Sequence, residues 1–179
     1  MPFREYWFPI RVTYGRVLLL KKHLDAKDIK NFVPLIRKVK LVDDKPVIKF
    51  VPAINNYIFI FTTSARVQEL KVEMEETIPI RFLYNPITKK PQIIRKKEME
   101  DFILVAGSLD EQLVYLKPGE VNLSKGDKVK IIAGPFKGVV GTFIRIKGDR
   151  RVVVAIEGLM AVATTFIHPS LIVPIPKKN

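Results

Sequence analysis

The pattern of apolar and polar positions divides the chain into a first half that mixes helices with strands and a second part made of strands alone. In the first half, apolar residues recur at helical spacing in three segments, for example at Val17, Leu20 and Leu24. The predicted helices span residues 16–27, 65–76 and 96–106. The predicted strands span residues 6–13, 39–42, 47–50, 56–62 and 78–84. The first half is therefore expected to be an α+β domain.

Two parts of this half have a character of their own. The run from Asn56 to Thr62 is apolar on both sides of the pleat, which predicts a central strand that is covered on both faces. The strands 39–42 and 47–50 flank Asp43-Asp44-Lys45-Pro46, which are typical turn residues. These two strands are predicted to form a projecting hairpin.

Beyond residue 106 the helical periodicity ends. Residues 107–124 contain acidic residues and Pro118-Gly119 but no sustained apolar stripe, so they are predicted to be a linker. Short strand patterns follow at 129–133, 139–146, 151–156, 161–167 and 171–173, separated by tight turns, which predicts a small five-stranded β-barrel. The expected domains are residues 1–106 and 125–179, joined by the linker 107–124.

Charge and composition restrict the class of protein further. The chain of 179 residues has 31 Lys and Arg against 18 Asp and Glu, a net charge of +13, and both halves carry a basic excess. Such an excess attracts polyanions, nucleic acid above all, although a solvated basic surface is the alternative interpretation. The chain contains no cysteine, so disulfides, thiolate metal sites and a cysteine nucleophile are excluded. A reducing cytoplasm is the expected setting.

Residues suited to catalysis are scarce. The two histidines, His23 and His168, fall in different predicted domains, so neither a zinc cluster nor a catalytic triad is expected. The segment 134–138 is not a phosphate-binding loop, because no Gly-Lys-Ser/Thr follows. We expect no enzyme activity, no cofactor and no metal. Residues 1–6 lack the order of a signal peptide, and no apolar run is long enough for a membrane helix, which predicts a soluble protein that does not bind membranes. We also expect it to be cytoplasmic and a monomer.

The most informative segment runs from Gly126 to Gly141 and reads Gly-Asp-Lys-Val-Lys-Ile-Ile-Ala-Gly-Pro-Phe-Lys-Gly-Val-Val-Gly. An alternating strand leads into a tight loop and a second strand, with glycines where a positive φ or a close backbone approach is needed. This segment resembles the KOW motif of the C-terminal barrels of NusG-type transcription factors and of some ribosomal proteins. An ordinary hairpin with turn glycines is the alternative.

The first half also resembles the N-terminal domain of NusG-type factors, called the NGN domain, an antiparallel sheet with flanking helices. The matching segments are residues 7–16, Trp-Phe-Pro-Ile-Arg-Val-Thr-Tyr-Gly-Arg, and the strand that begins at Tyr57. The chain departs from housekeeping NusG in two places. Asn55-Asn56 replaces a Pro-Gly pair, and residues 157–165 replace a Phe-Gly-Arg-x-Thr-Pro stretch in the barrel, which is expected to be SH3-like. With these two departures, the chain resembles a specialised paralogue, most closely the UpxY-type antiterminators of capsular polysaccharide operons.

The resemblance implies a function in transcription. The N-terminal domain would bind the clamp helices of RNA polymerase and suppress pausing or termination, and the barrel would recruit a second partner, a ribosomal protein or Rho. The implied polymerase-binding residues are aromatic or aliphatic side chains on and near the family's polymerase-contacting strand: Tyr57, Phe59, Phe82, Tyr84 and Ile94. For each aromatic residue, plain core packing is the alternative.

Two further sets of residues are candidates for binding. The first would contact the non-template DNA strand through cationic side chains and rings that can stack on an unpaired base: Arg11, Tyr14, Arg16, Lys22 and His23. A solvated helix face is the alternative. The second set lies in the loop of the KOW motif and would meet the partner of the barrel: Ile132, Pro135, Phe136 and Lys137. Phe136 is either a contact residue or a lid on the barrel.

Two broader questions follow from the resemblance. A ribosome-associated or general RNA-binding KOW protein is the competing function, but such a protein would not need the N-terminal half. RfaH, a member of the family, stores its C-terminal domain as a helical hairpin. Here β-branched residues dominate the strands, and Gly141, Gly148, Gly158 and Pro169 would interrupt long helices. We therefore predict a constitutive barrel.

Overall fold

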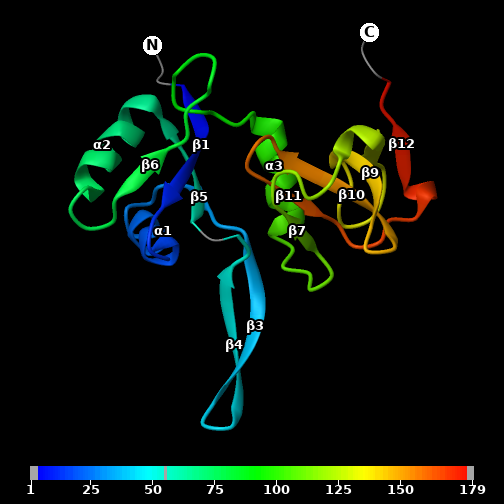
Figure 1. Cartoon of the computed structure of the whole chain (residues 1–179), viewed down its shortest axis with the longest axis horizontal. Helices are drawn as coiled ribbons and strands as arrows, with labels where there is room; N and C mark the ends of the chain where they lie inside the picture. The colour runs from blue at the N-terminus through cyan, green and yellow to red at the C-terminus, as the bar shows by residue number, and fades with distance from the viewer. Residues whose placement is uncertain (1–3, 55, 177–179) are drawn as a thin grey trace. The chain divides into compact units, whose positions relative to one another are not determined.

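The computed structural model describes residues 4–54 and 56–176, and it divides between Lys96 and Lys97 into two compact units. The helices and strands of the first unit are β1 (Glu5–Val12), α1 (Val17–Ala26), β2 (Asn31–Phe32), β3 (Leu35–Val42), β4 (Lys45–Pro52), β5 (Tyr57–Thr63), α2 (Ser64–Met74) and β6 (Ile80–Phe82) (Figure 1). The sheet has the order β2-β5-β1-β6, and its strands pair in antiparallel fashion. The predicted α+β fold of this half is confirmed.

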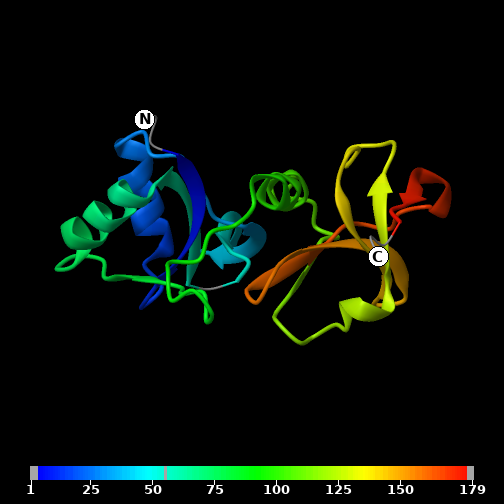
Figure 2. The same ribbon diagram turned by 90° about the horizontal axis from the view of Figure 1, so that it is seen from above.

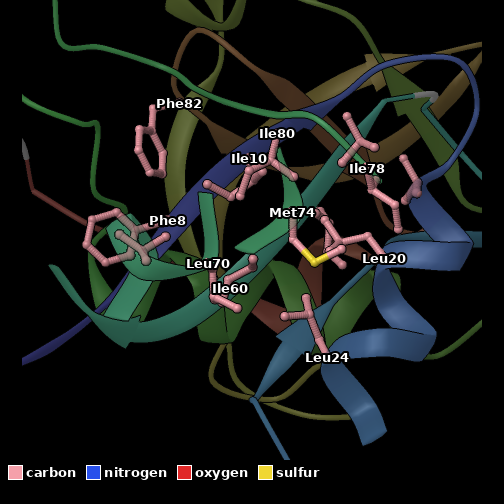
Figure 3. Packing of buried hydrophobic residues seen from close by; sticks show 14 of the residues in the cluster. Phe8, Ile10, Leu20, Leu24, Ile60, Leu70, Met74, Ile78, Ile80 and Phe82 are labelled. Carbon is pink, nitrogen blue, oxygen red and sulfur yellow. The ribbon is translucent and has the colours of Figure 1, made fainter. Parts of the chain in front are cut away.

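The main core of the first unit lies between one face of this sheet and the helices α1 and α2, which lie on the same side of it (Figures 1 and 2). The side chains of Phe8 and Ile10 on β1 and of Ile60 on β5 belong to one buried cluster with Leu20 and Leu24 of α1 and with Leu70 and Met74 of α2 (Figure 3). This packing explains the helical spacing of those residues, because each helix buries one apolar stripe. β5 is central in the sheet and buried on both faces, as predicted.

β3 and β4 form a separate two-stranded ribbon that extends away from the sheet of the first unit (Figure 1). The strands are longer than the sequence predicts, because Lys45 and Pro46 belong to β4 and only Asp43 and Asp44 form the turn. These two residues have φ values of 49° and 58°. A two-residue hairpin turn of type I′ requires φ above zero at both positions, and Asp tolerates this conformation better than most residues. The projecting hairpin is confirmed.

The second unit is a six-stranded antiparallel sheet that curls into a small barrel, with one helix beside it (Figure 2). Its elements are α3 (Lys96–Ala106), β7 (Val114–Leu116), β8 (Asp127–Ile131), β9 (Val140–Ile146), β10 (Asp149–Ile156), β11 (Met160–Ala163) and β12 (Ile172–Pro174), with short 3₁₀ turns at 123–125 and 169–171. The strand order is β12-β8-β9-β10-β11-β7. All five predicted barrel strands are present.

The sixth strand, β7, lies inside the segment that the sequence predicts to be a linker. It pairs with β11 through Leu116 opposite Ala161 and Val114 opposite Ala163. Val121 and Leu123 also pack against the barrel core. The guanidinium of Arg151 donates a hydrogen bond of 2.6 Å to the carbonyl of Gln112. A three-residue strand is too short to show a period, so only its pairing partner reveals it.

Helix α3 is attached to the barrel by polar contacts. The buried carboxylate of Asp101 accepts hydrogen bonds from the Lys97 ammonium at 2.5 Å and from the backbone N–H of Val140 at 3.3 Å. Lys97 also donates to the carbonyl of Gly138 at 3.1 Å. The helix therefore belongs to the second compact unit, and the division at residues 96 and 97 differs from the predicted bounds 1–106, 107–124 and 125–179.

Candidate functional site

The five residues implied in polymerase binding lie in different environments. Phe59 is fully buried, and Phe82 and Ile94 are also buried, so none of these three is a surface residue. The expectation of an exposed patch built on Phe59 is wrong, because β5 is the central strand and is covered on both faces. Tyr57 is half-buried at the start of β5, and Tyr84 is 54% exposed just beyond β6.

The same residues do not gather on one face of the sheet. Phe82 packs in the core on the side of the helices α1 and α2. Tyr57 and Phe59 alternate with Ile58 and Ile60, which belong to that core, and therefore point to the opposite face. Ile94 donates its backbone N–H to the carbonyl of Trp7 at 2.9 Å, which prolongs the sheet edge beside β1. The candidates that remain accessible are Tyr57, which is half-buried, and Tyr84, which is exposed.

A cluster that sequence reasoning missed lies on the sheet near this face. The ring centroids of Trp7 and Phe61 are 5.2 Å apart. The ammonium of Lys30 lies 5.6 Å from the Trp7 ring centroid and 5.0 Å from that of Phe61. An ammonium at this distance from an aromatic face is attracted by the ring quadrupole. No spacing signal could have found the cluster, because the three residues are far apart in the sequence. Trp7 and Phe61 meet through the pairing of β1 with β5, and the backbone N–H of Phe61 donates a hydrogen bond to the carbonyl of Lys30.

Among the candidate nucleic-acid-binding residues, Tyr14 and Arg16 come together after β1. Tyr14 is 86% exposed and has a φ of 58°. The Arg16 guanidinium lies 5.8 Å from the Tyr14 ring centroid and donates a hydrogen bond of 2.8 Å to the carbonyl of Thr77. The pair thus presents an exposed ring beside a positioned cation, a combination suited to a base and its phosphate.

The other three candidates of this set are more scattered. Arg11 is exposed on β1 and lies directly opposite Arg81 of β6. Lys22 is exposed on α1. His23 is half-buried, and its Nε2 is buried without a hydrogen-bond partner among the described residues. Because that nitrogen is turned away from solvent, His23 presents only part of its ring at the surface.

The loop of the KOW motif has the backbone that its glycines predict. Gly134 and Gly138 have φ values of 82° and 93°, and the N–H of Gly138 donates to the carbonyl of Ile131 at 2.8 Å. Of the candidate partner residues, Ile132, Pro135 and Lys137 are exposed. Phe136 is buried, which excludes a fully exposed contact and favours the interpretation as a lid.

Two electrostatic features depend on tertiary contacts. Hydrogen bonds from Arg66 and then from Lys27 lower the pKa of Glu73 to about 2. The Arg66 nitrogen lies 2.6 Å and the Lys27 nitrogen 2.7 Å from its carboxylate, so this exposed group ties α2 to the end of α1. In the second unit, burial raises the pKa of Tyr115 on β7 to about 12.

Within the part of the chain that the structure describes, no three His, Cys, Asp or Glu residues gather where they could hold a metal ion. The helices described are also too short or too polar to cross a membrane.

An antiparallel sheet with two helices on one face, followed in the chain by a small barrel carrying a KOW-type loop, is the architecture of a transcription factor with an NGN and a KOW-like domain. Residues 5–103 match the family described as "NusG: Transcription termination factor nusG". This match covers more than half of the chain, and the chain therefore belongs to the NusG family. Members of this family are non-enzymatic transcription elongation and antitermination factors that interact with RNA polymerase.

Among solved structures, the chain is similar to NusG of Thermotoga maritima, in a structure described as "Domain interaction in Thermotoga maritima NusG". The two are 22% identical, and the alignment covers 97% of this chain and 98% of that chain with a TM-score of 0.45. No curated protein matches the chain significantly.

Proposed function

We propose that this chain is a specialised, operon-specific NusG paralogue of the UpxY antiterminator type. It binds the clamp helices of RNA polymerase through its N-terminal unit and suppresses pausing or termination. Its KOW barrel recruits a second partner, a ribosomal protein or Rho. The observation that carries the proposal is the family match over residues 5–103 in a chain that continues into a KOW-type barrel.

The conformation of Asn56 supports placing this chain on the NusG pattern despite a substitution in the motif. Housekeeping relatives have glycine before the tyrosine of this strand, and Asn56 takes that position with a φ of 77°. Asn is the non-glycine residue best suited to left-handed backbone, so the turn is preserved while the side chain changes. Asn55, the other member of the pair, lies outside the described residues. The side-chain amide of Asn56 gives a specialised paralogue a polar group at a position where glycine has none.

The candidate residues that are exposed or half-buried divide among three contacts. Tyr57 and Tyr84 are the proposed polymerase contacts. The proposed contacts to the non-template DNA strand are Arg11, Tyr14, Arg16, Lys22 and the exposed part of His23. The barrel offers Ile132, Pro135 and Lys137 to its partner.

A pull-down from cell lysate with the tagged full chain tests the proposal. We expect polymerase subunits to be retained by the wild-type chain and lost with Tyr57→Ala combined with Tyr84→Ala. Retention of ribosomal particles without polymerase would instead establish the competing function of a ribosome-associated KOW protein. Sequencing RNA ends genome-wide after deletion of the gene then tests the operon-specific part. Changes in RNA ends that are spread evenly over many operons would contradict the operon-specific part of the proposal but would not contradict polymerase binding.

A further inference from the structure

The β3–β4 hairpin has two different faces, and both are largely exposed. Because side chains alternate along each strand, the pairing register of the hairpin decides which residues share a face. One face is mostly apolar and includes Val39 and Leu41, which are 61% and 72% exposed, together with Ile48 and Phe50. The other face carries four exposed lysines, which we call the lysine face: Lys38, Lys40, Lys45 and Lys49.

The stability of the fold does not explain the lysine face. Lys38 lies directly opposite Lys49 in the register, and like charges at directly opposed positions destabilise a sheet. Among the residues that the structure describes, none of the four lysines forms an ion pair with a carboxylate. The two acidic residues of the hairpin, Asp43 and Asp44, form its turn. The four ammonium groups are therefore left for an external anion.

We propose that the lysine face binds the phosphate backbone of a DNA duplex. A two-stranded ribbon is one of the elements that fit the B-DNA major groove, which is about 12 Å wide. Successive lysines on one strand, such as Lys38 and Lys40, are about 7 Å apart at a rise of about 3.4 Å per residue. The lysine face thus presents repeated positive charges along a narrow ribbon. The negatively charged phosphates of DNA border a groove that is similar in width to this ribbon.

The composition of the face favours a duplex over single-stranded nucleic acid or duplex RNA. Proteins that bind single strands stack aromatic side chains on the bases, but the neighbours of the lysines on this face are aliphatic: Ile36, Val42, Val47 and Val51. The one aromatic residue of the hairpin, Phe50, lies on the other face. The major groove of duplex RNA is deep and narrow and does not admit such a ribbon. DNA duplex binding here goes beyond the proposed function, since it uses neither polymerase nor the Tyr14 and Arg16 site.

Fluorescence anisotropy with a labelled 20-base-pair DNA duplex and the purified full chain tests the proposal. The test variant combines Lys38→Gln, Lys40→Gln, Lys45→Gln and Lys49→Gln. The control removes four charges elsewhere, by Lys89→Asn, Lys90→Gln, Lys117→Gln and Lys125→Gln, so that both variants have the same net charge. Asn is chosen at Lys89 because the φ there is 56°.

We expect the test variant to raise the Kd for the duplex at least about tenfold at 100 mM salt, and the control to change it less than about twofold. The slope of log affinity against log salt should fall by about 3 to 4 in the test variant, since each lost phosphate contact removes about 0.9. A third variant with arginine at all four hairpin positions keeps the charge and should retain binding.

Several results would overturn the proposal. Equal losses in the test and control variants would mean that only net charge matters. An unchanged affinity in the test variant would mean that the lysines merely keep an exposed hairpin from pairing with other chains. Loss of binding in the arginine variant would exclude a simple phosphate contact. Tighter binding to single-stranded DNA, to duplex RNA or to vesicles with one quarter anionic lipid than to the DNA duplex would assign the face to another partner.

Discussion

At the scale of single residues, the two aromatics of β5 differ sharply although they are two positions apart. Phe59 is fully buried and Tyr57 is half-buried at the strand end. We expect Phe59→Ala to destabilise the protein by about 3–5 kcal/mol, because it leaves a cavity in a packed interior. Tyr57→Ala should leave folding largely intact and weaken polymerase binding by about 2 kcal/mol or more, as for an interface anchor. Urea unfolding and polymerase affinity separate the two effects. A Phe59→Ala protein of wild-type stability would refute the core assignment.

Gly141 in β9 is a second residue whose role depends on its surroundings. A β-carbon there would lie 2.5 Å from the carbonyl oxygen of Val153 and 2.6 Å from a methyl carbon of Val152. Because a backbone oxygen cannot move aside cheaply, Gly141→Ala should destabilise the chain by about 1–3 kcal/mol.

Gly148 provides a control for this prediction. It has a φ of 90° and open space around it, so Gly148→Asn should cost less than Gly141→Ala. Denaturant unfolding followed by circular dichroism gives both values. Equal stability of the Gly141→Ala and wild-type proteins would show that β10 does not pack against β9 at Gly141 as closely as the structure indicates.

At the scale of elements, the contact between α1 and α2 through Glu73 predicts a pH dependence. The folded pKa of Glu73, about 2, lies below the ordinary value of 4.5, so its contribution to stability is present above pH 4.5 and is lost as the pH falls toward 2. Glu73→Gln should therefore reduce the loss of stability between pH 4.5 and 2. The carboxylate is exposed, so the effect should be small and should shrink in 1 M salt.

Thermal unfolding over that pH range, at low and high salt, measures this contribution. Glu76→Gln is the matched control, because Glu76 is an exposed carboxylate just beyond α2. A Glu73→Gln profile that coincides with both the wild-type and the Glu76→Gln profiles would contradict the ion-pair contact.

The pairing of β7 with the barrel makes a separate prediction for Tyr115. Burial raises its pKa from 10.0 to about 12, so the neutral phenol is favoured in the folded protein. The corresponding stability is present below pH 10 and is lost as the pH rises toward 12. Tyrosinate absorbance of the folded chain should show a late step that Tyr115→Phe removes and Tyr14→Phe does not. Absence of this step would indicate that β7 is not docked.

At the scale of the whole molecule, the state of the barrel can be tested in the intact chain. The six-stranded order includes β7, so a helical hairpin formed from 139–167 would have to break the β7–β11 pairing as well as the strands themselves. β-Branched residues and the breaks at Gly148 and Gly158 also disfavour long helices there. We expect backbone NMR chemical shifts in the full chain to indicate strand conformation for the residues of β8 to β12. Helical shifts over 139–167 would show that a second fold exists.

Much of the fold could be predicted from local patterns. The helix predicted at 96–106 has the bounds of α3, and the helix predicted at 16–27 differs from α1 by one residue at each end. The candidate site was less predictable. Tyr57 and Phe59 have the same alternation in the sequence, and Phe136 sits at a loop tip like an exposed residue. Burial at these positions depends on what covers them, which periodicity does not encode.

The sequence by itself determined the local conformations of this protein: the amphipathic helices, the strands, the projecting hairpin and the glycine positions of the KOW loop. These follow from side-chain period and from the backbone that Gly, Asn and Asp allow. The tertiary structure alone decided that β7 joins the barrel, that Asp101 attaches α3 to it and that Lys38 lies opposite Lys49. Each of these depends on a partner distant in the chain or on the register of a strand pair, and a shift of one residue would place every side chain of a strand on the other face.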